Sequence, residues 1–170
     1  MKRPPHSKNL RKGRHSEPNV RYFVTFNTRP PSLSLATSSY FDAFHRVVSQ
    51  MEADQQLSET SYTVMPDHVH LQLRLGEALT LSQAVGKLKH QSRKRSGFNP
   101  LNWQPGFHDH KLRTNEELHP ILHYIHLNPY RADLLAYDST WPYTHIDADA
   151  WKWFQSLLDK DCPYPEWLTE

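Results

Sequence analysis

Residues 62–75, YTVMPDHVHLQLRL, contain two extended segments joined by Pro66 and Asp67. From His68 onward polar and apolar residues alternate without a fault, which is the two-residue period of a strand with one buried face. The preceding residues 62–65 are largely aromatic or β-branched, as strands prefer. Because only two residues separate the segments, the stretch predicts a tight antiparallel hairpin.

The second segment carries two histidines of the same parity, His68 and His70, followed in register by Gln72 and Arg74. Residues two apart on a strand project to one side, roughly 6.5–7 Å apart along the chain. Two imidazoles placed in this way can converge on one metal ion. They can equally be polar surface residues of a half-exposed sheet, and the alternation alone leaves both interpretations open.

The rest of the chain supplies further elements around this hairpin. A strand is predicted at 22–26, a helix at 39–53 and a short strand at 107–112. Capping boxes at 80–83 and 114–117 open two amphipathic helices. Gly97 would end the first of these helices, and Asn128-Pro129 the second. Pro120 either begins that second helix or kinks its first turn, and a last helix is predicted at about 148–158.

The resulting order, β-α-β-β-α-β, is that of an α+β, ferredoxin-like or RRM-like antiparallel sheet. In this architecture helices cover one face, so Val69, Leu71, Leu73 and Leu75 are expected to pack beneath them. The face that carries His68 and His70 would then be open. We expect three regions: a basic N-terminal DNA-binding arm at 1–20, the folded domain at 21–135, and an acidic C-terminal helix and tail at 136–170.

Composition limits the class of protein. The single cysteine, Cys162, excludes a disulfide framework and any multi-cysteine zinc site. No apolar run is long enough to span a membrane, so we expect a cytoplasmic protein without a membrane partner. Residues 1–21 carry seven basic residues against one acid, whereas residues 133–170 carry eight acids against two lysines. A basic arm of this kind attracts polyanions, although a solvated tail has the same composition.

Two residues of the helix that follows residue 117 are candidates to act with the histidines. Tyr124 and Asn128 are four residues apart, so they share one face of the helix and border its apolar stripe of Leu118, Ile121, Leu122 and Ile125. Taken alone, Tyr124 is equally a boundary aromatic and Asn128 a helix-terminal residue. Spacing does not decide between these interpretations.

Four motifs in order carry a family resemblance: RKGRHSEPNVRYFVTFNT at 11–28, YTVMPDHVHL at 62–71, NWQPGFHDHKLR at 102–113 and HYIHLNPYRADLL at 123–135. Together they resemble the REP-associated tyrosine transposases, bacterial relatives of the IS200/IS605 single-tyrosine HUH transposases. The resemblance covers most of the chain and leaves the acidic tail outside. Pro120, and Asp133 where a glycine is usual, depart from the family pattern.

The resemblance implies a metal-dependent endonuclease that cleaves single-stranded DNA at REP- or BIME-like hairpins and transfers the strand through a 5′-phosphotyrosine. Tyr124 would be the nucleophile, and His68, His70 and Asn128 would hold Mg²⁺ or Mn²⁺. Imidazole by itself also suits Zn²⁺. A monomer acting in cis is implied rather than a dimer. The residues expected to bind DNA are Arg11, Lys12, Arg14, Ser16, Arg21, Lys87, Lys89 and Arg93.

Two other functions are compatible with parts of the sequence. A non-catalytic, sheet-based protein that binds DNA or RNA hairpins would share the basic residues, but the third predicted strand lacks the aromatic pattern of an RRM. A hydrolase built on His119 and His123 would have an H-x-x-x-H spacing without the glutamate of H-E-x-x-H. Tyr22, Trp103 and Phe107 are either core residues or platforms for unpaired bases.

Overall fold

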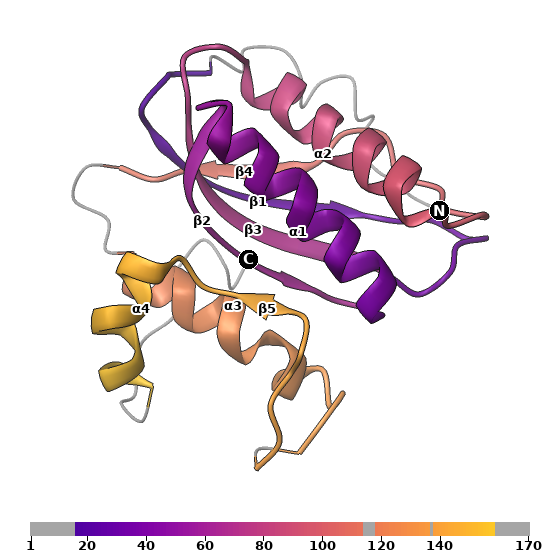
Figure 1. Ribbon diagram of the computed structural model, residues 1–170. Helices are drawn as coiled ribbons and strands as arrows, with labels where there is room; N and C mark the ends of the chain where they lie inside the picture. The colour runs from indigo at the N-terminus through magenta and orange to yellow at the C-terminus, as the bar shows by residue number, and fades with distance from the viewer. Residues whose placement is uncertain (1–15, 114–117, 137, 159–170) are drawn as a thin grey trace, which may run out of the picture.

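Five strands form one antiparallel sheet in the order β4-β1-β3-β2-β5 in the computed structural model, which describes residues 16–113, 118–136 and 138–158 (Figure 1). The strands are β1 (Arg21–Asn27), β2 (Leu57–Val64), β3 (His68–Leu75), β4 (His108–Lys111) and β5 (Thr144–His145). The helices are α1 (Ser38–Ala53), α2 (Leu81–Ser96), α3 (His119–Arg131) and α4 (Ala148–Phe154), and a 3₁₀ turn follows at Gln155–Leu157. The predicted β-α-β-β-α-β order and α+β class are confirmed.

The central hairpin has the predicted register. Val64 pairs with Val69, and the backbone N–H of Met65 donates to the carbonyl of His68 over 2.8 Å. Strand β3 pairs with β1 on its other side, with His70 opposite Thr25 and His68 opposite Asn27. The strand that bears the two histidines therefore lies in the middle of the sheet, with a strand on each side.

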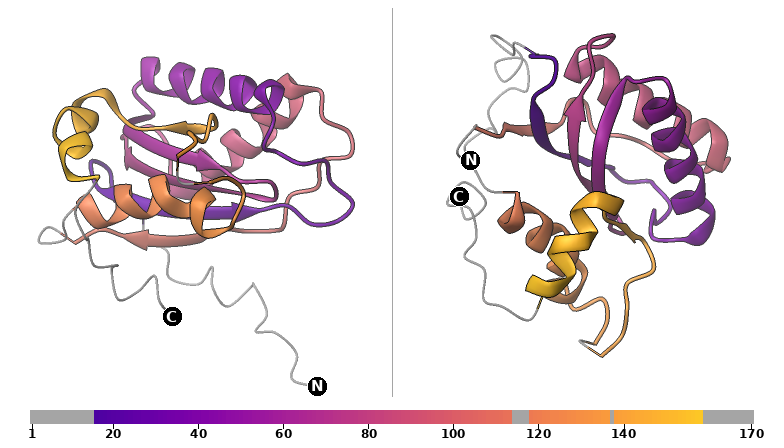
Figure 2. Two further views of the ribbon diagram at one scale, coloured as in Figure 1. Left: turned by 90° about the horizontal axis from the view of Figure 1, so that it is seen from below. Right: turned by 60° about the vertical axis from the view of Figure 1, so that its left-hand side comes forward.

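Helices α1 and α2 cover one face of the sheet (Figure 2). Both helices begin at a threonine side chain, Thr37 or Thr80, that accepts a backbone N–H; α2 has the complete predicted capping box and ends at Gly97 in a left-handed conformation. The alternate residues of β3, Val69, Leu71, Leu73 and Leu75, are fully buried against them. This half of the predicted alternation is confirmed.

The second face is not left open, because α3 lies against it and contacts β2 and β3. Ile121 and Ile125 of α3 are buried against Phe23 of β1. His70 and Gln72, expected on an open surface, are consequently buried. The expectation of an open face was based only on the alternation of polar and apolar residues along β3. Phe23 makes the same face partly apolar and gives the helix a surface on which to pack.

The bounds of α3 also differ from the prediction. Pro120 lies in its first turn, where a proline removes no helical hydrogen bond. Asn128-Pro129 does not end the helix, which continues to Arg131 with Pro129 inside it. A proline deletes only its own N–H bond, and the next turns close through bonds such as Ala132 N–H to Asn128 O. The capping box proposed at 114–117 lies outside the described residues.

The segment after α3 joins the same body. Strand β5, which the sequence did not predict, pairs with the edge of β2. Phe154 of α4 is completely buried against Leu122 of α3. The predicted helix at 148–158 is shorter as an α-helix and continues as the 3₁₀ turn. The boundaries proposed at residues 20 and 135 remain predictions. Within the described parts of the chain, no helix combines the length and the apolarity that a membrane crossing needs.

Two glycines should respond oppositely to substitution by alanine. A Cβ at Gly76 would collide with the carbonyl oxygen of Gln55 and lie 2.9 Å from that of Gln56, whereas a Cβ at Gly86 would meet no atom within 4 Å. Gly76→Ala is therefore expected to lower the free energy of unfolding by roughly 1–3 kcal/mol. Gly86→Ala should raise it by about 0.5–1 kcal/mol. Urea denaturation of both variants measures the difference, and equal effects would contradict the packing described.

Candidate active site

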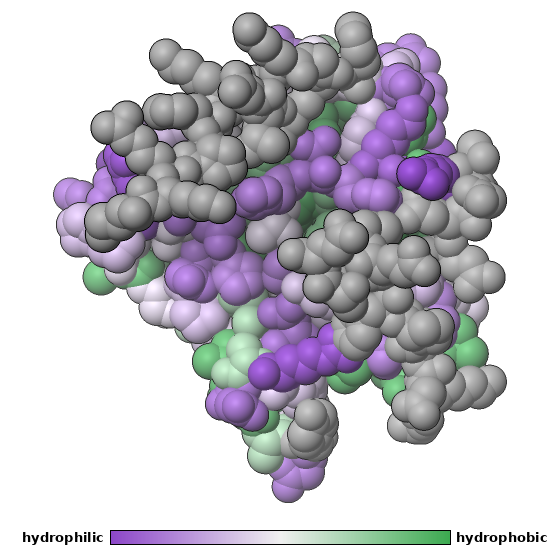
Figure 3. All heavy atoms as spheres, turned by 180° about the vertical axis from the view of Figure 1, so that it is seen from behind, coloured by the Kyte–Doolittle hydropathy of each residue, from purple (hydrophilic) through white to green (hydrophobic). Residues whose placement is uncertain are grey.

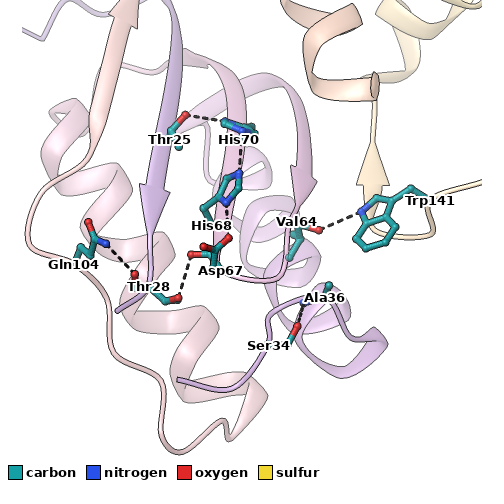
Figure 4. Close-up of polar contacts among 10 residues, drawn as sticks. All are labelled: Thr25, Thr28, Ser34, Ala36, Val64, Asp67, His68, His70, Gln104 and Trp141. Carbon is teal, nitrogen blue, oxygen red and sulfur yellow. Dashed lines mark hydrogen bonds and ion pairs between the residues drawn. The ribbon is translucent and has the colours of Figure 1, made fainter. Parts of the chain in front are cut away.

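The rings of His68 and His70 converge on one point of the sheet face that α3 partly covers. Their Nε2 atoms are 3.0 Å apart, and the ring planes cross at 78° with centroids 4.6 Å apart. Figure 4 shows the tip of each ring directed at the other. The alternation of β3 brings both rings to this side, as predicted, and leaves two nitrogen atoms within reach of one small ligand.

The opposite nitrogen of each ring is held by a neighbouring side chain. Nδ1 of His68 lies 2.7 Å from Oδ1 of Asp67, and Nδ1 of His70 lies 2.8 Å from Oγ1 of Thr25 (Figure 4). A carboxylate can only accept, so Nδ1 of His68 carries the proton. The Thr25 hydroxyl can accept from Nδ1–H of His70 in the same way. The two Nε2 atoms lie within hydrogen-bond distance of each other, and with both protons on Nδ1 their lone pairs would both be available to a shared cation.

Burial keeps His70 neutral. Only 6% of the residue is exposed, and this desolvation, together with the neighbouring His68, lowers the pKa of His70 to about 3. Phe23 stacks on the ring with centroids 5.7 Å apart. A neutral imidazole is the form that binds a metal ion, so the environment of His70 favours the ligand form at physiological pH.

The nucleophile candidate lies directly beside this pair. The ring of Tyr124 meets that of His70 edge to face, with centroids 5.1 Å apart, and that of Phe23 with centroids 5.9 Å apart. The packing of α3 on Phe23 fixes this position, because Tyr124 lies between the two isoleucines that make the contact. Tyr124 is half-buried rather than part of the core. The structure therefore brings His68, His70 and Tyr124 together.

Asn128 lies one helical turn beyond Tyr124 on the same side of α3. No hydrogen bond joins its side chain to either histidine within the described ranges. Within those ranges there is also no group of three or more His, Cys, Asp and Glu side chains placed to hold a metal ion. A third side chain that binds the ion beside the two imidazoles would thus be of another chemical type. The carboxamide of Asn128 is such a group.

The residues expected to bind DNA fall into three groups. Arg11, Lys12 and Arg14 lie outside the described residues. Four others have structural partners: Ser16 accepts the N–H of Leu81, Arg21 pairs with Glu59, Lys87 donates to Gln56, and Lys89 donates to the carbonyls of Gln104 and Gly106. Arg93 is exposed in the last turn of α2. Figure 3, from the side opposite α1 and α2, shows mostly hydrophilic side chains wherever the described residues are visible.

Two residues of the site were missed by the sequence analysis, Thr25 and Asp67. Asp67 was assigned only to the turn, although its place next to a histidine was a usable signal. Thr25 lies 45 residues from His70 and reaches it only through the register of β1 with β3. Of the H-x-x-x-H pair considered from the sequence, His119 packs against Phe154, with ring centroids 5.9 Å apart, and His123 is buried.

Comparisons with known proteins identify the family and the fold. The family model described as "Transposase IS200 like" matches residues 32–128. A REP-associated tyrosine transposase of Escherichia coli (strain K12) is 26% identical over 129 residues, which cover 75% of this chain and 77% of that protein. The solved structure of a REP-associated tyrosine transposase bound to a REP hairpin superposes with a TM-score of 0.65 at 22% identity, covering 88% of this chain and 86% of the other. This last similarity shows the fold.

Proposed function

The chain belongs to the IS200-like transposase family, and on that premise we propose that it cuts and rejoins single-stranded DNA at REP-type hairpins through a covalent bond to Tyr124. One observation carries the proposal. The ring of His70 contacts both partners of the proposed reaction centre, with its Nε2 3.0 Å from that of His68 and its ring centroid 5.1 Å from that of Tyr124. The proposed nucleophile, Tyr124, is thus in direct contact with one of the two potential metal ligands, His70.

The residues of this chain would perform the nucleophilic step. The Tyr124 hydroxyl loses its proton to solvent, and its oxygen attacks the scissile phosphorus. The bond from phosphorus to the 3′ oxygen breaks, and that oxygen takes up a proton. The products are a 5′-phosphotyrosine and a free 3′ hydroxyl. Attack by another 3′ hydroxyl reverses the chemistry and returns the tyrosine, so joining needs no ATP.

The donor set fits a divalent ion. Two imidazoles present their Nε2 atoms to one point, each held in place through Nδ1, which is the usual arrangement around metal-binding histidines. His68, His70 and Asn128 would hold Mg²⁺ or Mn²⁺, which when bound orients the phosphate and stabilises the charge that develops on its oxygens. This role matters because an ordinary tyrosine, with a pKa near 10, is a weak nucleophile at neutral pH.

The substrate is proposed from the relatives and from charge. The solved neighbour is described as bound to a REP hairpin, and the basic residues 1–21 together with exposed Arg93 favour contact with phosphates here. The ring of Tyr124 contacts that of His70 in the same chain, so the proposed site can form in cis within a monomer.

A covalent-adduct assay tests this function. The protein is mixed with Mn²⁺ or Mg²⁺ and a labelled DNA hairpin that carries an unpaired flank, and the products are separated under denaturing conditions. We expect a labelled band that resists SDS, with the DNA attached to the peptide that contains Tyr124 by mass spectrometry. If an RNA hairpin of the same shape binds equally well and no adduct forms with either nucleic acid, the protein is a hairpin-binding module without catalysis.

Thr25 would not bind the metal ion itself, but it should affect metal affinity through its hydrogen bond with His70. Thr25→Val keeps the shape of the side chain and removes the hydroxyl 2.8 Å from Nδ1 of His70, so the ring loses its fixed orientation and tautomer. The dissociation constant for Mn²⁺, measured by calorimetry, is expected to rise about 10- to 100-fold. Thr25→Ser, which restores the hydroxyl, should recover most of the affinity. An unchanged constant in Thr25→Val would refute this role.

A further inference from the structure

The edge strand β4 places a second pair of histidines on the sheet face that carries the candidate active site. Strand β4 pairs with β1, and His108 lies opposite Thr25. His110 lies opposite Phe23 in the same ladder. Residues directly opposite each other on paired strands share one face of the sheet. Thr25 hydrogen bonds to His70 and Phe23 stacks on it, so both β4 histidines belong to the face of the candidate metal ligands.

His108 lies in the same row of the sheet as His70. Thr25 is opposite His108 on one side and opposite His70 on the other, so the three residues form a row across β4, β1 and β3 (Figure 1). Neighbouring strands are about 4.8 Å apart, which places the backbones of His108 and His70 roughly 9.5–10 Å apart. Thr25, the residue between them, is short and is turned toward His70 (Figure 4). The row therefore has no bulky side chain between its two imidazoles.

This row remains accessible in the part of the chain that the structure describes. Thr25 is only half-buried although β1 has a strand on each side, and His108 is exposed. Helix α3 instead contacts β2 and β3 and covers Phe23, which is 5% exposed. A phosphodiester bound at His70 can therefore extend over Thr25 toward His108. His110 is placed differently, because the ring of Phe23 occupies the next position of its row.

The candidate nucleophile reaches the same place from another direction. The ring of Tyr124 meets those of His70 and Phe23, so it lies where α3 packs over β1 and β3. His108 lies on β4, on the far side of β1. In a displacement at phosphorus the attacking and leaving oxygens are roughly in line, on opposite sides of the phosphorus. If the Tyr124 oxygen attacks from the side of α3, the leaving 3′ oxygen points toward the β4 edge, where His108 lies.

We propose that His108 is the general acid of the cleavage step, an assignment that rests on the proposed function. As the bond from phosphorus to the 3′ oxygen breaks, the protonated imidazole of His108 donates its proton to that oxygen, which leaves as a 3′ hydroxyl. In the joining step the neutral imidazole takes the proton from the attacking 3′ hydroxyl and returns to its starting form. Imidazole suits both steps because it exchanges a proton near neutral pH. General acid–base catalysis of this kind contributes about 10²- to 10⁴-fold to a rate.

A change of the leaving atom tests this assignment. His108→Gln keeps a polar side chain at an exposed position, so the variant should fold with an unchanged circular dichroism spectrum. Its single-turnover rate of adduct formation with a DNA hairpin and Mn²⁺ is expected to fall at least about 100-fold. In a second substrate, sulfur replaces the scissile 3′ oxygen, and a thiolate is a weak enough base to leave without a proton. The variant and the wild-type protein should form the adduct with this second substrate at similar rates.

His110→Gln is the matched control, because it changes the same residue type on the same strand and the same face. Its ratio of the sulfur rate to the oxygen rate should equal that of the wild-type protein. The proposal is overturned if His108→Gln slows both substrates equally or slows neither, or if the selective loss appears in His110→Gln instead. Those results leave adduct formation by the wild-type protein intact. If the wild-type protein forms no adduct with either substrate, the proposed function fails, and this inference fails with it.

Discussion

Replacing Tyr124 with phenylalanine is expected to abolish the covalent protein–DNA adduct and to lower the cleavage rate by at least about 10³-fold. The substitution removes only the hydroxyl. The aromatic ring, which meets His70 and Phe23 edge to face, stays in place, so α3 keeps its position on the sheet. Hairpin binding by anisotropy should therefore be unchanged while the adduct band disappears from denaturing gels.

Tyr130→Phe is the matched control, because Tyr130 lies on the same helix and its hydroxyl has a structural partner. That hydroxyl donates to the carbonyl of Ser139 over 2.8 Å. The loss of this bond should cost about 1 kcal/mol of stability and leave the adduct intact. If Tyr124→Phe still forms the adduct and Tyr130→Phe does not, the nucleophile is Tyr130 and the assignment made here is wrong.

The second large effect is expected from His68→Ala. This substitution deletes one of the two Nε2 atoms that converge. The dissociation constant for Mn²⁺ should rise at least about 100-fold, since loss of a direct ligand exceeds the effect of an orienting neighbour. Adduct formation at micromolar Mn²⁺ should fall in parallel, and EDTA should have the same effect on the wild-type protein.

A distant histidine provides the control for this prediction. His90→Ala changes an exposed residue of α2 and should leave both metal affinity and adduct formation unchanged. Calorimetry and the adduct assay are applied to both variants. The same Mn²⁺ dissociation constant in His68→Ala and in wild type would show that the histidine pair does not hold the ion.

The elements with a local signal were predictable from the sequence. The alternation after His68 gave β3 and its two faces, and the threonine–glutamine pair at 80–83 gave the start of α2. The candidate site was partly predictable for the same reason, because one strand supplies both histidines. The place of α3 was not, since it depends on Phe23 from a strand far away in the chain.

Contacts between distant segments account for the remaining differences. Gln72 follows the polar parity of β3, yet α3 covers it, and both heteroatoms of its carboxamide are buried without a hydrogen-bond partner in the described structure. Lys87 and Lys89 appear as free charge in the sequence, whereas both ammonium groups are hydrogen bonded to other parts of the chain. The two-residue period of a strand and the 3.6-residue period of a helix do not reveal such contacts between distant segments.

In the proposed mechanism His70 would contribute both to metal binding and to the placement of Tyr124, whereas His68 would contribute to metal binding alone. Nε2 of this imidazole meets that of His68, and the ring makes an edge-to-face contact with that of Tyr124, so a substitution at residue 70 would displace both the proposed cation and the proposed nucleophile. A substitution at residue 68 alters the cation alone. The cleavage rates of variants at residues 68 and 70, compared at saturating metal, would therefore separate the contribution of charge neutralisation from that of the alignment of the attacking oxygen.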